Sequence, residues 1–330
     1  MKKLYLITLI FLIISIISSC EKPDQRFDTK QLEKNLQTLY VENLNEAGFI
    51  NPETQKIDIM ITNRAYCINE YFGMKFKIND NKLKILVLTK LSDMMDINKI
   101  NRGLSKEMET IDLSYKLGIN LDEDLKEKII KTLEKYLEEE SIKINGTDKA
   151  AINNNLQYKV QIHYNFLYIA DKLDIGISET TTNIINENLS IVEKNLSDIE
   201  SNSAKALYYI NMVKYHLNLP IQKNDVFEQL KYLRMPDGGY SFLPIEDQKT
   251  IDLYKDEVKG DAYSTRLVYE LYLYLNNSNP SEDIVDFLKE EILKTNEYSD
   301  VYFYINNLYD VVYLSKVIGY NNHNEITLGR

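Results

Sequence analysis

The sequence contains no tryptophan and little glycine, proline, histidine or cysteine. Its 330 residues include 11 Gly, 6 Pro, 3 His and 2 Cys, against 25 Tyr and no Trp. The absence of tryptophan counts against carbohydrate processing, where broad aromatic rings stack on sugars. Glycine and proline punctuate turns, so their scarcity favours long regular segments over a loop-rich chain.

Familiar catalytic and nucleotide-binding motifs are also absent. The chain has no GxGxxG, P-loop, HExxH or GxSxG sequence, so nucleotide binding and common hydrolase sites have no local support. His163, His216 and His323 do not lie at metal-ligand spacing from one another or from Cys67. The sequence therefore predicts neither a metal nor a cofactor.

The charge is acidic. Lys and Arg total 39 and Asp and Glu total 50, which gives a formal net charge of −11. Phosphate contacts in nucleic-acid complexes come mainly from Lys and Arg. We therefore expect no nucleic-acid partner, and an anionic membrane surface would repel the acidic body. We also expect a monomer.

The N-terminus has the pattern of a secretory signal. Lys2 and Lys3 precede an apolar run over 4–17, and that run ends in Ile17-Ser18-Ser19-Cys20. A short basic region, a short apolar core and small residues before a cleavage point are typical of a signal peptide. An ordinary signal peptide or an uncleaved anchor with an accidental cysteine is the alternative.

The last four residues of this pattern resemble the lipobox of bacterial lipoproteins. The resemblance implies diacylglyceryl transfer to the Cys20 thiol, cleavage before Cys20 and an acylated N-terminus. Residues 1–19 are then the signal peptide, and 20–28 are the lipidated N-terminus and linker. The implied location is the extracytoplasmic face of the cell membrane, with the membrane as a partner through the lipid. Cys67 would have no disulfide partner, and its setting favours a small buried apolar residue over a reactive thiol.

Apolar residues recur at helical spacing over most of the chain after residue 28. Six segments end alike, with an apolar helix followed by Gly, Asn or Asp and a short apolar link; the ends fall at Gly73, Gly118, Asp174, Asn218, Asn276 and Gly319. Gly or Asn just past a helix is the usual left-handed cap. Each interval between these ends has room for two helices, which is the signature of a helix-pair repeat.

The alternation predicts six helix pairs. The first members, which have one charged face, are expected over 29–44, 80–95, 122–139, 179–196, 222–234 and 281–294. The second members, several of which are apolar on more than one face, are expected over 57–72, 102–117, 154–173, 201–217, 261–275 and 300–318. Amphipathic helices around buried ones favour an all-α fold, an (α/α)6 toroid of six outer and inner helices over 29–320. An open helical-pair solenoid is the alternative, and 321–330 is a polar tail.

One loop carries a second resemblance. Asp237-Gly238-Gly239-Tyr240 is followed by Asp261-Ala262-Tyr263-Ser264-Thr265, and Gly48-Phe49 forms a degenerate second copy. The pattern is similar to the repeat of protein prenyltransferase β-subunits and terpenoid cyclases of the squalene–hopene type. The glycines predict a tight turn with positive φ angles, and Tyr240 is expected to fill the space between helix layers.

The resemblance implies the fold and not the activity. Cyclases of this fold use a DxDD-type acidic cluster, which this chain lacks, and prenyltransferases hold zinc with Asp, Cys and His. The nearest acidic run, Asp122-Glu123-Asp124, starts a predicted outer helix, where acids favour the positive end of the helix.

A candidate pocket is expected where the N-termini of the inner helices converge. Backbone N–H groups at this rim favour a negative group. The residues expected there are Asn63, Arg64, His163, Tyr164, Asp261, Tyr263, Thr265, Arg266, Tyr302 and Tyr304. In the alternative interpretation, Arg64 and Arg266 only pair with the nearby acids Glu70 and Glu270.

Two functions are compatible with these features. The first is a membrane-anchored lipoprotein whose toroid is a non-catalytic module that binds a ligand or a protein partner. The second is an extracytoplasmic enzyme, a polysaccharide lyase or glycosidase ahead of a terpenoid cyclase. A deep cleft with converging ionisable groups would favour the enzyme, and a centre filled by Tyr, Leu and Ile would favour binding.

Overall fold

The computed structural model describes residues 29–140, 149–196, 201–245, 259–275, 283–294 and 301–317. These residues form a mostly helical protein with one small antiparallel sheet, which confirms the predicted helical class. The signal peptide, Cys20, the linker over 20–28 and the tail over 321–330 lie outside the described residues.

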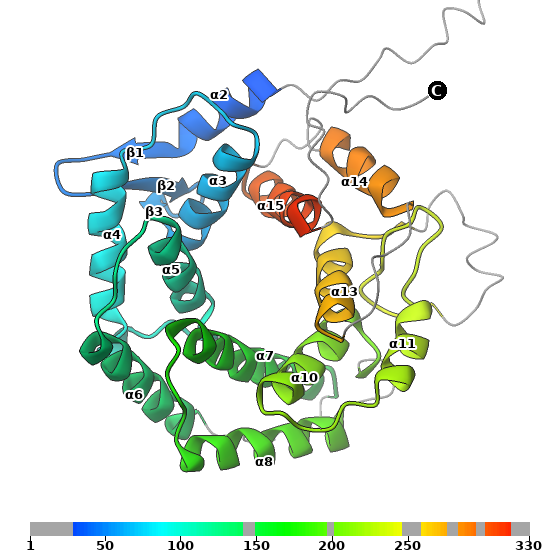
Figure 1. The fold of residues 1–330 in the computed structure, drawn as a ribbon. Helices are drawn as coiled ribbons and strands as arrows, with labels where there is room; N and C mark the ends of the chain where they lie inside the picture. The colour runs from blue at the N-terminus through cyan, green and yellow to red at the C-terminus, as the bar shows by residue number, and fades with distance from the viewer. Residues whose placement is uncertain are drawn as a thin grey trace, which may run out of the picture.

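The helices form two sets in space (Figure 1). The inner set surrounds the centre and consists of α3 (Ile59–Tyr71), α5 (Ser105–Lys116), α7 (Lys149–Leu173), α10 (Ala204–His216), α13 (Ala262–Tyr274) and α15 (Val301–Val317). The outer set consists of α2 (Thr29–Leu39), α4 (Asp80–Asp93), α6 (Glu123–Glu139), α8 (Glu179–Asn195), α11 (Lys223–Lys231) and α14 (Asp283–Lys294). A short 3-10 helix, η1 (Ile97–Lys99), follows α4.

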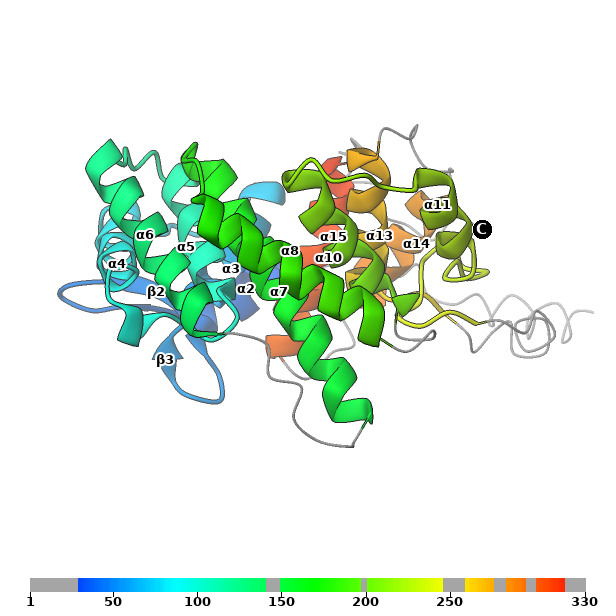
Figure 2. The same ribbon diagram turned by 90° about the horizontal axis from the view of Figure 1, so that it is seen from below.

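Neighbouring inner helices contact one another in chain order. The contacts run from α3 to α5, α7, α10, α13 and α15, and α15 contacts α3 again. Outer helices pack on this set, with α4 against α5, α6 and α8 against α7, and α14 against α15. Figure 2 shows the same arrangement from below, where α7 extends past its neighbours.

The predicted helix ends agree closely with the structure where both can be compared. Left-handed residues follow four inner helices, with φ values between 53° and 64° at Asn218, Asp174, Gly73 and Gly118. The predicted ends at Asn276 and Gly319 lie outside the described residues. Helix α7 begins five residues earlier than expected. Helix α11 ends at Lys231 because the chain then turns into the glycine loop.

Burial separates the two sets as the periodicity predicts. The outer helix α6 buries one stripe of Ile129, Ile130, Leu133, Tyr136 and Leu137 and leaves its charged residues at the surface. The inner helix α10 is buried at nearly every position from Ala204 to Val213. A helix that is apolar all round must be covered on all sides, and its neighbours α7 and α13 provide this cover.

The first predicted helix, 29–44, is wrong in its last five residues. The chain leaves α2 at Leu39 and forms β1 (Tyr40–Glu42), which pairs with β2 (Ala47–Asn51), and β2 pairs with β3 (Lys56–Ile57). Tyr40 packs edge-on against Phe49 and Phe76, with ring centroids 5.4 and 5.0 Å apart. Cross-strand aromatic packing therefore outweighs the helical spacing here.

The two predicted copies of the glycine motif share one hydrogen-bond pattern. The amide of Tyr240 donates to the Thr265 hydroxyl at 2.9 Å, and the Asp261 amide donates to the Tyr240 carbonyl at 3.0 Å. In the first copy the Phe49 amide donates to the Thr62 hydroxyl at 3.0 Å, and the Asp58 amide donates to the Phe49 carbonyl at 2.9 Å.

In each copy the aspartate is also the N-cap of the following inner helix. Asp58 Oδ1 accepts from the Met60 amide at 2.9 Å, and Asp261 Oδ1 accepts from the Ser264 amide at 2.7 Å. The same backbone segment thus precedes α3 and α13, although the first copy forms a strand.

The glycine loop differs from expectation in one respect. Gly238 has the predicted positive φ, 88°, whereas Gly239 does not. Gly239 is required by a close approach, because a Cβ there would lie 2.5 Å from the ring of the buried Phe287 in α14. Asp237 closes the loop by accepting from the Gly260 amide at 3.0 Å. Tyr240 is buried, as predicted.

Candidate functional site

A central cavity of about 160 Å³ is lined by residues of every inner helix. Its walls are aromatic and charged rather than aliphatic. The tyrosines that line it are Tyr164, Tyr168, Tyr208, Tyr209, Tyr263, Tyr274, Tyr309 and Tyr313. The ionisable side chains that line it are Arg64, Glu109, Asp112, Arg266 and Glu270. The centre thus combines the converging ionisable groups that would favour an enzyme with the tyrosines that would favour a binding module.

Arg64 on α3 is held by two other helices. Its Nε lies 3.2 Å from Glu109 Oε1 on α5, and its Nη1 donates to Asn306 Oδ1 on α15. The guanidinium carbon lies 5.3 Å from the Tyr309 ring centre. Asn63, beside Arg64, donates to the second Glu109 oxygen. A cation–π contact and a carboxylate therefore balance the Arg64 charge together.

Arg266 on α13 is held in the same way by α15. Its Nε lies 2.9 Å from Asp310 Oδ1, and both side chains are largely buried. The guanidinium carbon lies 5.6, 5.8 and 5.6 Å from the ring centres of Tyr263, Tyr309 and Tyr313. Burial raises the pKa of Asp310, while the charges of Arg266 and Arg64 act in the opposite direction.

Glu270 ends a chain of tyrosine hydroxyls. Tyr164 and Tyr208 share a hydrogen bond of 2.8 Å, and the Tyr208 hydroxyl donates to Glu270 Oε2. Burial raises the pKa of Glu270, and the positive charge of Arg266 lowers it in part. Glu270 thus accepts its hydrogen bond from a tyrosine hydroxyl and also feels the charge of Arg266.

Asp112 has a similar environment on α5. The Tyr168 hydroxyl donates to Asp112 Oδ1 at 2.7 Å. Burial raises the pKa of Asp112, and its hydrogen bond to Tyr168 and the charge of Lys116 lower it in part. Half-buried Asp112 and buried Glu270 are thus two carboxyl groups that each accept a hydrogen bond from a tyrosine.

Four of the ten expected pocket residues line this cavity: Arg64, Tyr164, Tyr263 and Arg266. The arginines do not pair locally, since the partners in their ion pairs, Glu109 and Asp310, lie on neighbouring helices. The ion pairs are therefore with acids of neighbouring helices and not with Glu70 or Glu270, although the charge of Arg266 also acts on Glu270. Because both arginines have carboxylate partners, the rim offers less free positive charge than the sequence suggested.

Of the other expected residues, some stabilise the fold, and the side chains of others lie outside the described part of the structure. Asn63 donates a hydrogen bond to Glu109, Asp261 caps α13, and the Thr265 hydroxyl accepts from the Tyr240 amide. Tyr302 and Tyr304 lie in the first turn of α15, and their side chains are outside the described part.

His163 points away from the cavity. Its Nε2 lies 3.1 Å from Asn188 Nδ2 on the outer helix α8, and the side chain is buried. Burial lowers the pKa of His163 to about 3, so the ring is neutral at physiological pH.

Sequence reasoning missed Glu109, Asp112 and Asp310. Each is an acidic residue within an inner helix that is otherwise buried, and this is the signal that could have found them. A buried charge requires a partner. Acids and arginines within buried helices are therefore expected to meet at the centre.

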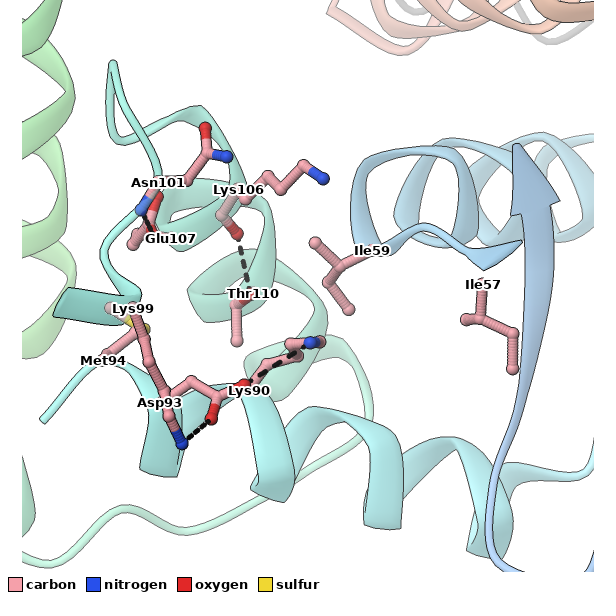
Figure 3. Close-up of a pocket in the computed structure, with 10 residues that line it drawn as sticks. All are labelled: Ile57, Ile59, Lys90, Asp93, Met94, Lys99, Asn101, Lys106, Glu107 and Thr110. Atoms are coloured by element: carbon pink, nitrogen blue, oxygen red, sulfur yellow. Dashed lines mark hydrogen bonds and ion pairs between the residues drawn. The ribbon is translucent and has the colours of Figure 1, made fainter. Parts of the chain in front are cut away.

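A second cavity, of about 230 Å³, lies between α4, α5 and the start of α3 (Figure 3). Its lysines are paired with acids: Lys90 and Lys99 share Asp93 at 3.4 and 3.0 Å. Glu107 accepts from the Asn101 amide at 2.6 Å and is buried. This cavity belongs to one wall of the molecule, whereas the central cavity joins all the inner helices.

Within the described residues no group of three or more His, Cys, Asp or Glu side chains could hold a metal ion. No described helix is long and apolar enough to cross a membrane. Comparison with known proteins finds no matching family model, curated protein or solved structure.

Proposed function

We propose that this protein is a lipid-anchored, extracytoplasmic binding protein whose central cavity holds a small polar ligand without catalysis. The proposed location rests on the N-terminal pattern, in which an apolar run ends in Ile17-Ser18-Ser19-Cys20. An acyl-modified Cys20 would hold the acidic body at the membrane surface through its lipid. The protein would act there as a monomer.

The proposed architecture is an (α/α)6 toroid like that of prenyltransferases and terpenoid cyclases. The contact between α15 and α3 supports it, because an open solenoid would leave its first and last inner helices apart. The repeated backbone pattern before α3 and α13 supports it as well. The resemblance supports the proposed fold only, and the residues of the central cavity support the proposed binding function.

The central cavity is the observation that carries the proposal. Aromatic walls with a few fixed polar groups are typical of small-molecule sites. At about 160 Å³ it is smaller than most sites for drug-sized ligands, so the ligand has few atoms. Arg64 with Glu109, and Arg266 with Asp310, supply a rigid polar frame, while Tyr168 and Tyr208 offer rings and hydroxyls.

A second candidate is an enzyme on the same scaffold, a polysaccharide lyase or a glycosidase. It is favoured by one observation, the raised pKa of two carboxyl groups in the cavity, Asp112 and Glu270. The binding function is preferred because tyrosines hold both groups and both arginines are neutralised. Release of reducing sugar or unsaturated uronate from a polysaccharide panel, lost in Glu270→Gln, would establish the enzyme instead.

A thermal-shift screen with two matched variants tests the binding function. Met108 lines the cavity, and Met108→Trp would fill it. Met95, exposed on the outer surface, provides the control Met95→Trp. The expected result is a compound, from a panel of small polar metabolites, that raises the melting temperature of wild type and Met95→Trp but not of Met108→Trp. An equal shift in all three proteins, or no shift with any compound, would contradict the proposal.

A further inference from the structure

Beyond the cavity, a thiol and an amine meet between two inner helices. Cys67 on α3 is buried and free, and Lys116 on α5 places its Nζ 2.8 Å from Cys67 Sγ. The same Nζ donates to Asn63 Oδ1 at 2.9 Å. Asn63 also lies 3.8 Å from Cys67 Sγ and donates through its amide nitrogen to Glu109. Asn63 thus fixes the amine against the sulfur.

We propose that Cys67 and Lys116 form a redox-sensitive covalent bridge through one oxygen atom, Sγ–O–Nζ. Dioxygen is the oxidant. One thiol, one ammonium group and one dioxygen give the bridge, one water and one proton. The S–H bond and two N–H bonds break, the S–O and O–N bonds form, and Nζ keeps one hydrogen. Of the three protons freed, two enter the water and one is released. Sulfur and nitrogen lose two electrons each, and dioxygen takes up all four.

Three features of the pair favour this reaction over other fates of a thiol. The sulfur and nitrogen are already about as close as a single bridging oxygen would hold them. Cys67 is one of two cysteines in the chain, and its burial hinders disulfide formation with another molecule. Lys116 is exposed, so dioxygen can reach the pair from the surface.

The bridge would change the wall of the central cavity. It ties α3 to α5 beside Asn63, which supports the pair formed by Arg64 and Glu109. It also removes the positive charge of Lys116, and that charge lowers the pKa of Asp112 in the free state. Oxidation would therefore do two things at once: it would link α3 covalently to α5, and it would remove one positive charge from beside the cavity.

Peptide mass spectrometry of the whole protein, purified in air without thiol reagents, tests the bridge. The expected product is a peptide that joins Cys67 to Lys116, heavier than its two parts by one oxygen and lighter by two hydrogens. Dithiothreitol should return free cysteine and lysine. Lys116→Arg keeps the charge but lacks a primary amine, so the product should disappear, and it should persist in Lys172→Arg.

Three results would overturn the proposal. They are a thiol that stays free after prolonged exposure to air, a link that lacks the oxygen, and a Cys67 oxyacid without any link. Circular dichroism of Lys116→Arg verifies its fold, because loss of the product must reflect the missing amine. As a second readout, dithiothreitol should lower the melting temperature of wild type and leave that of Lys116→Arg unchanged.

Discussion

Replacement of His163 should make the protein less sensitive to mild acid. Asn188 Nδ2 donates to His163 Nε2, which places the ring proton on Nδ1, and Nδ1 has no partner among the described residues. Burial and the charge of Lys159 lower the pKa of His163 from 6.5 to about 3. The unfolded chain therefore takes up a proton near pH 6.5, whereas the folded protein does not.

The sign and size of the effect follow from proton linkage. Between the two pKa values the unfolded state of His163 binds more protons, so stability falls as the pH decreases. From pH 7 to pH 5 this single group should remove about 2 kcal/mol from the free energy of unfolding. In contrast, the raised pKa values of buried Glu270 and Asp310 make folding more favourable as the pH decreases.

A difference between proteins isolates the histidine. Urea unfolding of wild type and His163→Gln at pH 7 and pH 5 gives two pH dependences, and the shared contribution of the carboxyl groups cancels between them. Wild type should lose about 2 kcal/mol more than His163→Gln. His216→Gln is the matched control, since burial lowers the pKa of the partly buried His216 less. Equal pH dependence in wild type and His163→Gln would refute the reasoning.

Three further changes probe the loop, the centre and the anchor. Gly239→Ala should lower the free energy of unfolding, measured in urea, by about 1–3 kcal/mol, because the new Cβ would meet the Phe287 ring. The loss should be smaller in a Phe287→Leu background, and an equal loss in both backgrounds would contradict the contact. Arg266→Ala leaves Asp310 buried without its partner and should lower the free energy of unfolding by about 3–5 kcal/mol, and adding Asp310→Asn should recover part of this loss. An unchanged melting temperature would show that the ion pair is dispensable. Cys20→Ala should release the protein from the membrane fraction, and an N-terminus without acyl groups in the wild type, measured by mass spectrometry, would exclude the anchor.

Local signals in the sequence predicted most of the helices. The left-handed caps at Gly73 and Gly118 depend on neighbours within a few residues, so they can be predicted without tertiary structure. The strand at Tyr40 could not be read in this way. It depends on Phe49 and Phe76, and the spacing of Thr29–Leu39 continues past it without a break.

The candidate site was predicted in part for the same reason. Arg64 and Arg266 stand out as charges within apolar helices, whereas their partners Glu109 and Asp310 lie on other segments, and sequence spacing favours local pairing. The direction of a side chain around a buried helix was also beyond the sequence. His163 and Tyr164 are adjacent, yet one faces the outer layer and the other the cavity.

A crystal structure of the mature protein soaked with the compound that most raises its melting temperature tests the central claim directly. The account predicts electron density for the compound in the central cavity, in contact with the pair of Arg64 and Glu109 or with Asp112 and Tyr168. Density in the second cavity between α4 and α5, or on the outer surface with the central cavity unoccupied, would contradict it.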